Sequence, residues 1–268
     1  MLVLNNHKQN EQPMRNYTSD STDSQWKIIE KIIQDKRKSR KNELRTVMNA
    51  ILYLLTTGCQ WRNLPREFGA WTSLYYYFDQ WKRTGLIEEI YRMLHRKVRI
   101  AEGRGPEPTL DIIDSQSVKT TRRSSEVRGF DGGKKIKGRK RHIICDTSRL
   151  PIAVIVHAAN IHDSKTAPEV IDELTNVSGS VKTIIADGGY RGKTLADIVE
   201  HSAGLKLEIT LRKTPSKEFK RLFKRWIIER SFSWLESFRR LSRDYEFLND
   251  SAQTVIYLAF IKIILKKF

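Results

Sequence analysis

The hydrophobic pattern of this chain changes character at a segment rich in glycine, proline and charge, residues 101–108. Before it, apolar residues recur at helical spacing; after it, short apolar runs alternate with amphipathic stretches. This change predicts an all-helical part followed by an α/β part. The predicted segments are a polar flexible N-terminus at 1–23, a helical domain at 24–100, a linker at 101–109, an α/β domain at 110–248 and a core-closing helix at 249–268.

The part before the linker is predicted to contain only helices and turns. Gly58 is a natural end for the second helix, since glycine adopts the left-handed conformation that closes helices. The arrangement is typical of a basic helix-turn-helix module that binds DNA. The predicted helices cover about residues 24–33, 43–57, 71–82 and 86–99.

The part after the linker is predicted to follow the order strand-strand-strand-helix-strand-helix-strand-helix. This is the order of the ribonuclease H-like fold, an α/β fold with a mixed five-stranded sheet and flanking helices, although a fold alone does not establish function. The predicted strands cover about residues 110–114, 140–146, 151–158, 181–186 and 206–211, and the helices about 165–175, 192–203 and 218–241.

Three acidic residues occupy places that this fold brings together at one sheet edge. Asp114 closes the first strand, Asp187 follows the fourth, and Glu229 lies in the last long helix. Mg²⁺ prefers oxygen ligands, and a pair of ions can stabilise both the attacking and the leaving oxygen of a phosphodiester. We therefore predict that Asp114 bridges two Mg²⁺ ions, with Asp187 on one and Glu229 on the other. Asp111 is a rival for the first position, but in an extended strand it faces away from Asp114.

The charge of the chain points to a polyanionic partner. Its 268 residues include 49 Lys and Arg against 31 Asp and Glu, a formal net charge of +18. Such an excess suits a phosphate backbone. The segment 117–142 combines glycines with basic residues and is predicted to be a flexible hairpin or loop along DNA; its alternative is a solvated basic loop. Its candidate DNA-binding residues are Lys119, Lys137, Arg139, Lys140, Arg141 and His142.

The last long helix adds a second set of basic candidates. Arg225 precedes Glu229 by one helical turn, so it can reach a phosphate beside the metal site or form an ordinary surface ion pair with Glu229. The other candidates for DNA contact are Arg230, Arg239 and Arg240.

The remaining polar residues favour simpler roles. Cys59 and Cys145 fit neither a zinc spacing nor a disulfide framework, which favours a reducing cytoplasm. The apolar tail at 255–265 is too short to cross a membrane. After the third strand, His162 and Asp163 are expected to shape the turn into the next helix, with Asp163 or Ser164 as its cap, and His157 and His162 are not expected to bind metal.

At these residues the chain resembles a known family. It is similar to bacterial insertion-sequence transposases of the DDE type, specifically the insertion sequence five family. The resembling stretches are Thr57-Gly-Cys-Gln-Trp-Arg-Asn-Leu-Pro65, Ile112-Ile-Asp-Ser-Gln-Ser-Val-Lys-Thr120, Lys137-Gly-Arg-Lys-Arg-His142, His157-Ala-Ala-Asn-Ile-His-Asp163, Ala186-Asp-Gly-Gly-Tyr-Arg-Gly192, Trp226-Ile-Ile-Glu-Arg-Ser-Phe-Ser-Trp-Leu235 and Arg239-Arg-Leu-Ser-Arg-Asp-Tyr-Glu246.

The resemblance implies Mg²⁺-dependent transposition, for which Mn²⁺ can substitute. It implies catalytic roles for the three acids, binding of the element's terminal inverted repeats, cleavage there, and transfer of the freed 3′-hydroxyl to target DNA. It also implies work at the bacterial nucleoid, as a homodimer or larger assembly on DNA. The family's helix pattern has an Arg where Arg225 stands, but a Tyr where Leu222 stands and a basic residue where Glu236 stands. Arg239 and Arg240 are candidates to supply that missing charge.

Two other functions fit the same residues. A ribonuclease H-like nuclease would cut DNA without joining it. A DNA-binding repressor derived from a transposase would do neither, although the presence of all three acids argues against the loss of metal ligands.

Overall fold

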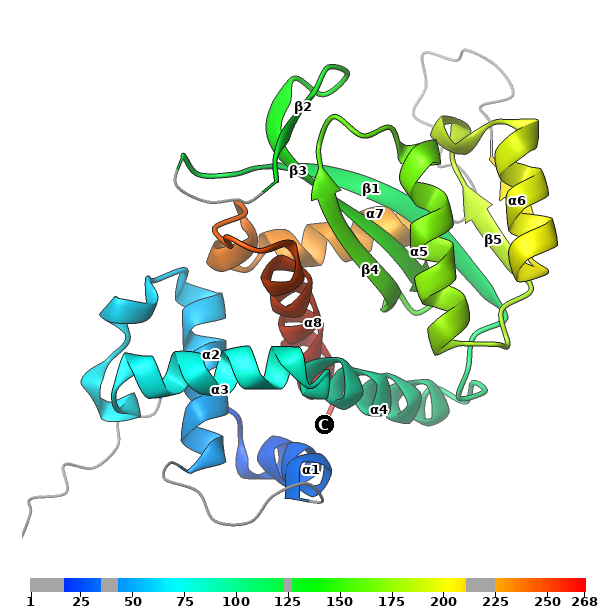
Figure 1. The fold of residues 1–268 in the computed structure, drawn as a ribbon. Coiled ribbons are helices and arrows are strands. Elements are labelled where there is room, and N and C mark those ends of the chain that lie inside the picture. Colours follow the sequence, from blue (N-terminus) through cyan, green and yellow to red (C-terminus); the bar gives the residue numbers. More distant parts are fainter. Residues whose placement is uncertain (1–16, 35–42, 123–126, 211–224) are drawn as a thin grey trace, which may run out of the picture.

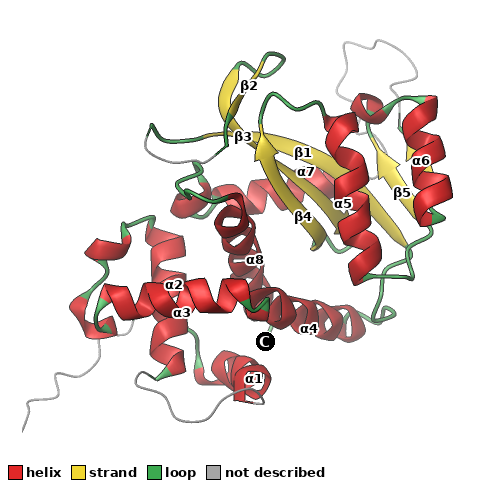
Figure 2. Cartoon of the chain, in the orientation of Figure 1, coloured by secondary structure: helices red, strands yellow, loops and turns green. Residues whose placement is uncertain are grey.

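The computed structural model describes residues 17–34, 43–122, 127–210 and 225–268. It contains a helical part and a twisted sheet with helices on both faces (Figures 1 and 2). The helices are α1 (Asp23–Gln34), α2 (Leu44–Thr57), α3 (Trp71–Arg83), α4 (Leu86–Ala101), α5 (Asp163–Val177), α6 (Lys193–Ala203), α7 (Arg225–Glu236) and α8 (Asn249–Leu265). The strands are β1 (Leu110–Lys119), β2 (Gly129–Asp131), β3 (Ile136–Asp146), β4 (Pro151–Ala158), β5 (Thr183–Ala186) and β6 (Lys206–Ile209).

The helical part matches the helices predicted from hydrophobic spacing. Helix α2 ends at Gly58, which has a φ of 69° and donates its backbone N–H to the carbonyl of Leu54. An added Cβ would also lie only 3.0 Å from Cβ of Arg239. Gly58 therefore ends the helix and lets the chain after α7 approach it closely, two demands that glycine meets best.

The sheet has the mixed order of a ribonuclease H-like core. Its strands run in the order β2-β3-β1-β5-β6, and β4 also pairs with β3. The pairs β1–β3 and β3–β4 are antiparallel, whereas β1–β5 and β5–β6 are parallel. The predicted α/β class and ribonuclease H-like core are thus confirmed, with the short strand β2 added to the five predicted strands.

The basic segment at 117–142 forms a hairpin, one of the two forms predicted for it, but more of it is regular strand than was expected. Strand β1 continues to Lys119, β2 and β3 form the hairpin, and β3 begins at Ile136. Strand β3 is flanked by partner strands on both sides, and its residues from Gly138 to Asp146 are all buried. A strand buried on both faces lacks the polar–apolar alternation that reveals half-buried strands, so the charges alone suggested a loop.

The sheet separates two apolar cores. On one face, Ile113, Ile144 and Ile184 pack with residues of α5 and α6. On the other, Ile112 and Ile185 join a larger core shared with α7, α8 and the helices of the helical part. Helix α8 is buried along most of its length and contacts both α4 and β4 (Figure 1). The parts of the chain before and after the predicted linker at 101–109 therefore share one continuous core. Their division into separate domains remains a prediction.

Helix α7 is shorter than the helix predicted at 218–241. Helix α7 ends at Glu236, earlier than the predicted residue 241, and residues 218–224 lie outside the described residues. The Ser237 hydroxyl donates to the Trp234 carbonyl, a bond that competes with helix continuation, and Phe238 is extended. Across the described ranges, no helix combines the length and apolar character needed to cross a membrane.

Candidate active site

The parallel pairing of β1 and β5 places two of the three predicted acids side by side. Leu110 lies opposite Thr183 and Ile112 opposite Ile185. The pairing ends there, so Asp114 and Asp187 each stand two residues beyond the last pair, on strands that lie about 4.8 Å apart where they pair. Both aspartates are partly buried. The two aspartates thus follow neighbouring strands, as the order of the elements predicts, and their joint role as metal ligands stays a prediction.

A tight turn after β5 fixes the position of Asp187. Its Oδ1 accepts the backbone N–H of Gly189 at 2.7 Å and caps the short 3₁₀ turn Gly188–Tyr190. A Cβ built on Gly189 would lie 3.0 Å from this oxygen and 3.7 Å from Oδ2 of Asp163. The missing side chain of Gly189 therefore leaves room for two carboxylates to flank it.

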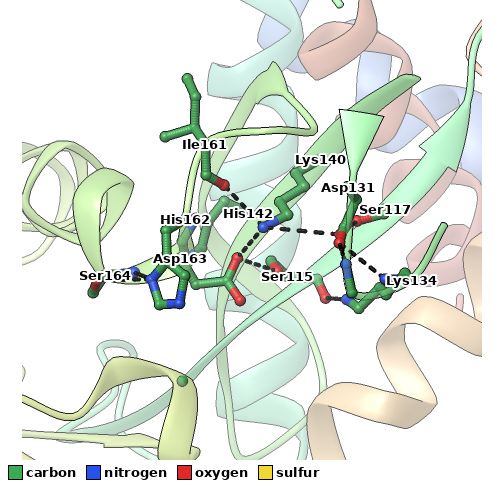
Figure 3. A network of polar contacts seen from close by, with 12 residues as sticks. Ser115, Ser117, Asp131, Lys134, Lys140, His142, Ile161, His162, Asp163 and Ser164 are labelled. Carbon is green, nitrogen blue, oxygen red and sulfur yellow. Dashed lines mark hydrogen bonds and ion pairs between the residues drawn. The ribbon is translucent and has the colours of Figure 1, made fainter. Parts of the chain in front are cut away.

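Asp163 is a residue of this site that the sequence reasoning assigned only to a helix cap. The cap of α5 is instead His162, whose Nδ1 accepts the backbone N–H of Ser164. Asp163 turns towards the sheet, where Oδ1 accepts from Ser115 Oγ at 2.8 Å and from Lys140 Nζ at 2.9 Å (Figure 3). Burial raises the pKa of Asp163, but these two hydrogen bonds outweigh burial and leave it below the usual range. Asp163 is therefore a charged neighbour of the strand that carries Asp114.

Tyr190 lies buried beneath the acids. Burial raises its pKa well above the usual range, and the negative charges of Asp114, Asp163 and Asp187 raise it further. The charges of three carboxylates, from β1, α5 and the turn after β5, thus act on one phenol. The sequence offered a signal for this residue, because Tyr190 follows Asp187 by three residues in the same motif, but it did not indicate a role.

A series of hydrogen bonds links the Tyr190 hydroxyl to two histidines. Its hydroxyl lies 2.6 Å from Nε2 of His142, whose Nδ1 lies 3.4 Å from Nε2 of His157, and Nδ1 of His157 lies 3.0 Å from the Ala158 carbonyl. Burial and His157 lower the pKa of His142 to about 3, so its ring is neutral. Because a carbonyl only accepts, each neutral ring donates from Nδ1 and accepts at Nε2. The Tyr190 hydroxyl therefore donates to His142, away from the acids.

Glu229 does not join the two aspartates in a group of three metal-binding side chains. It lies exposed on α7, which packs against β1 and β3. Glu236, two turns later, accepts a hydrogen bond from Gln116 of β1 at 3.0 Å, so α7 runs along the strand that carries Asp114. Among the residues that the structure describes, no three His, Cys, Asp or Glu side chains lie close enough together to hold a metal ion. The oxygen ligands of Asp114 and Asp187 fit a hard divalent cation, and the third carboxylate remains apart.

The four predicted DNA-binding residues from 139 to 142 are buried and bound to the protein itself. Arg139 has no exposed surface and bonds to the carbonyls of Val127, Glu246 and Phe247 and to Asp244. The structure therefore corrects the expectation that this run lies along phosphates, since β3 carries it through the sheet. The other three are Lys140, Arg141 and His142.

The other basic candidates differ in exposure. Arg240 is buried, pairs with Glu246 at 2.8 Å and donates to the Cys59 carbonyl, so it links the chain after α7 to the helical part. The side chain of Arg225 and the whole of Leu222 lie outside the described residues. The exposed candidates are Lys119, Lys137, Arg230 and Arg239.

Comparison with known proteins gives matches along most of the chain. The family described as "Transposase DDE domain" matches residues 105–263, and "Putative transposase of IS4/5 family" matches residues 22–91. The "Putative transposase for insertion sequence element IS402" of Burkholderia cepacia is 30% identical over 137 residues, 47% of this chain and 60% of that protein. The chain thus matches less than two thirds of that relative's length.

Two further relatives carry names that state no activity. The insertion element IS402 uncharacterized 16.2 kDa protein of Burkholderia cepacia is 26% identical over 123 residues, 42% of this chain and 76% of that protein. Uncharacterized protein y4sN of Sinorhizobium fredii is 26% identical over 116 residues, 42% of this chain and 86% of that protein.

Proposed function

Because this chain belongs to the transposase DDE domain family, in which a divalent metal generally serves the reaction on DNA, we propose that it is an insertion-sequence transposase. It binds the terminal inverted repeats of its element, cuts at their ends and joins the freed 3′-hydroxyl to target DNA. The observation that supports this most directly is the parallel pairing of β1 with β5, because Asp114 and Asp187 each stand two residues beyond its last pair.

The proposed cofactor is Mg²⁺, as two ions, with Mn²⁺ able to substitute. Asp114 is proposed to bridge both ions, Asp187 to bind one and Glu229 the other. When bound, the ions would activate the attacking oxygen and stabilise the leaving oxygen of the phosphodiester. Because Glu229 does not lie in a group of three ligands, we propose that α7 or its side chains shift towards β1 when metal and DNA bind.

The other residues of the site are proposed to position the ligands. The Tyr190 hydroxyl donates to His142, which anchors the turn that carries Asp187. Asp163 holds Ser115, the residue after Asp114. Each aspartate is therefore tied to a rigid neighbour, which reduces the entropy lost when it binds metal.

DNA binding is proposed to rest on exposed basic side chains rather than on the buried run of β3. Lys119, Lys137, Arg230 and Arg239 meet this condition. The helical part is proposed to contribute to recognition of the element ends. Pairing two ends calls for at least a homodimer on DNA, which we propose forms at the bacterial nucleoid in the cytoplasm.

A cleavage and strand-transfer assay on DNA that carries the element ends tests the proposal. Wild type should cut and join these ends with Mg²⁺, and Asp187→Asn should lower the cleavage rate on the order of 10³-fold, equal to about 4 kcal/mol of barrier. The exposed Asp197 of α6 supplies a matched control, because Asp197→Asn makes the same chemical change outside the site.

The outcomes separate the three candidate functions. Cutting without joined products would indicate a nuclease. Tight DNA binding with no cutting would indicate a repressor, and in that case Asp114→Ala would not change metal titration of the protein. If Asp187→Asn cut as fast as wild type, the assignment of the acids would be wrong.

A further inference from the structure

The β2–β3 hairpin carries an exposed aromatic side chain, Phe130. Phe130 pairs with Lys137 across the two strands, and its exposed fraction is 56%. Residues directly opposite in an antiparallel pair point to the same face. The phenyl ring and the ammonium group of Lys137 therefore leave the hairpin on one side, and the hairpin stands out from the sheet (Figure 1).

The exposed charges of this hairpin are all of one sign. From residue 127 to residue 138, each exposed charged side chain is basic: Arg128, Lys134, Lys135 and Lys137. The acidic residue of this stretch, Asp131, is buried and accepts hydrogen bonds from Ser117 Oγ and from the backbone N–H groups of Gly133 and Lys134. The surface around Phe130 therefore suits a polyanion.

Polar contacts tie the hairpin to the strand of Asp114. Asp131 bonds to Ser117 at 2.5 Å, and Lys134 Nζ donates to the Ser115 carbonyl at 3.1 Å (Figure 3). Ser115 follows Asp114 directly. The side chain of Lys134, in the turn of the hairpin, thus reaches the backbone of the residue that follows a proposed metal ligand.

Two glycines press the base of the hairpin against its neighbours. Gly129 and Gly138 face each other across the strands. A Cβ on Gly129 would lie 1.8 Å from Oδ1 of Asn160, and one on Gly138 would lie 1.9 Å from the Val118 carbonyl. At Gly138 the neighbour is backbone and leaves no room for a side chain, so the base of the hairpin packs closely against β1.

We propose that Phe130 is a stacking residue for an unpaired DNA base next to the cleavage site, with the hairpin lysines on the adjoining phosphates. The inference rests on the proposed function. Phenylalanine offers an aromatic face but no hydrogen bond, so it gains most from a base that is free to stack. Bases within a duplex are already stacked, and opening a step costs a few kcal/mol. The favoured partner is therefore single-stranded DNA at the element end.

Binding measurements in a metal chelator test this without catalysis. The probes are a duplex with a single-stranded thymidine overhang, the same strand fully paired, and the same duplex with an abasic overhang. Wild type should bind the thymidine overhang at least about 5-fold more tightly than either other probe, which corresponds to about 1 kcal/mol of stacking. Phe130→Ala should lose this preference, and Phe130→Trp should keep it.

Two variants separate stacking from folding and from general apolar contact. Phe130→Leu keeps an apolar side chain without an aromatic face, so it should behave like Phe130→Ala. Phe268, exposed at the end of α8, gives the matched control, and Phe268→Ala should bind like wild type. Thermal unfolding of each variant checks that the fold is kept.

Three results would overturn the inference: Phe130→Ala or Phe130→Leu keeping the preference, wild type binding the abasic overhang equally well, or wild type favouring the paired probe. These results leave the proposed function intact if wild type still cuts element ends with Mg²⁺. Failure of wild type to bind any probe would contradict both proposals.

Discussion

The stretch of β1 from Asp111 to Asp114 carries an acidic residue at each end, and the two residues lie in opposite environments. At its start, Asp111 is fully buried opposite Asp146 of β3. Three residues later, Asp114 is only partly buried and stands, like Asp187, two residues beyond the last pair of β1 with β5. The same strand therefore holds one acid pair inside the protein and another at the sheet edge, where metal and DNA could reach it.

In the buried pair, Asp146 is charged and Asp111 is neutral. Asp146 bonds to Arg99 and lies 3.1 Å from His95 Nε2, and it also accepts two backbone N–H groups. Within the described residues, neither carboxyl oxygen of Asp111 has a hydrogen-bond partner. Burial and the charge of Asp146 raise the pKa of Asp111 well above its usual range. Asp111 can thus stay buried because it keeps its proton.

The difference shows what separates a structural acid from a candidate ligand. Asp146 is committed to Arg99, inside the protein, whereas Asp114 and Asp187 each accept a backbone N–H through one oxygen, at 2.7 Å, near the surface. The inner end should respond to substitution mainly through stability, and the outer end mainly through activity.

The largest expected stability effect is at the inner end. Arg99→Met should lower the free energy of unfolding by about 3–5 kcal/mol, because it leaves the buried Asp146 charge without its guanidinium partner. Chemical denaturation measures the change. Arg96, on the same helix, pairs with Glu107 near the surface, so Arg96→Met should change stability by about 1 kcal/mol or less. Equal losses of stability for the two variants would show that the buried Arg99–Asp146 pair contributes no more than the surface pair.

A smaller loss is expected for the ion pair at the outer end. Lys140→Met should lower the free energy of unfolding by about 1.5–3 kcal/mol, because Asp163 keeps its bond to Ser115 and part of its exposure. It should leave the salt dependence of DNA binding unchanged, since Lys140 is turned inward. Lys137→Met should do the reverse: stability is kept, and the slope of log affinity against log salt falls by about 1. A reduced slope for Lys140→Met would mean that the buried lysine reaches DNA.

Periodicity and strand order predict more of this molecule than its charges do. The strand expected at 151–158 has those bounds, and the strands that lead to Asp114 and Asp187 are paired neighbours, as the predicted order of elements requires. These features depend on local pattern and on topology. Whether Glu229 joins the two aspartates depends on how α7 sits, and strand order does not determine that.

The sequence does not show which individual charged side chains are buried and which are exposed. Arg139 was expected at a DNA surface but has no exposed area, because its partners come from segments about one hundred residues further along the chain. Asp163 and Tyr190 reach the site from α5 and from the turn after β5, and their convergence needs the packed sheet. A sequence shows how many charges a chain has, but pairing inside the fold decides which of them remain available.

The last prediction concerns the neutral acid of the inner end. An unfolded Asp ionises near pH 4, whereas folded Asp111 keeps its proton to higher pH. Between these two pKa values, the folded state binds more protons than the unfolded state. The contribution of Asp111 to stability is therefore complete below about pH 4 and is lost as pH rises towards the folded pKa. Asp111→Asn cannot ionise and should remove that loss, by about 1.4 kcal/mol for each unit of raised pKa.

Unfolding measured near pH 4 and near pH 7 tests this difference. Asp111→Asn should gain stability over wild type at the higher pH, while any difference at the lower pH should reflect only the exchange of a neutral carboxyl for an amide. Asp197→Asn, on exposed α6 surface, should show the same small difference at both. If Asp111→Asn instead lost stability at the higher pH, Asp111 would be charged when folded. The two ends of the stretch from Asp111 to Asp114 would then differ in exposure but not in protonation.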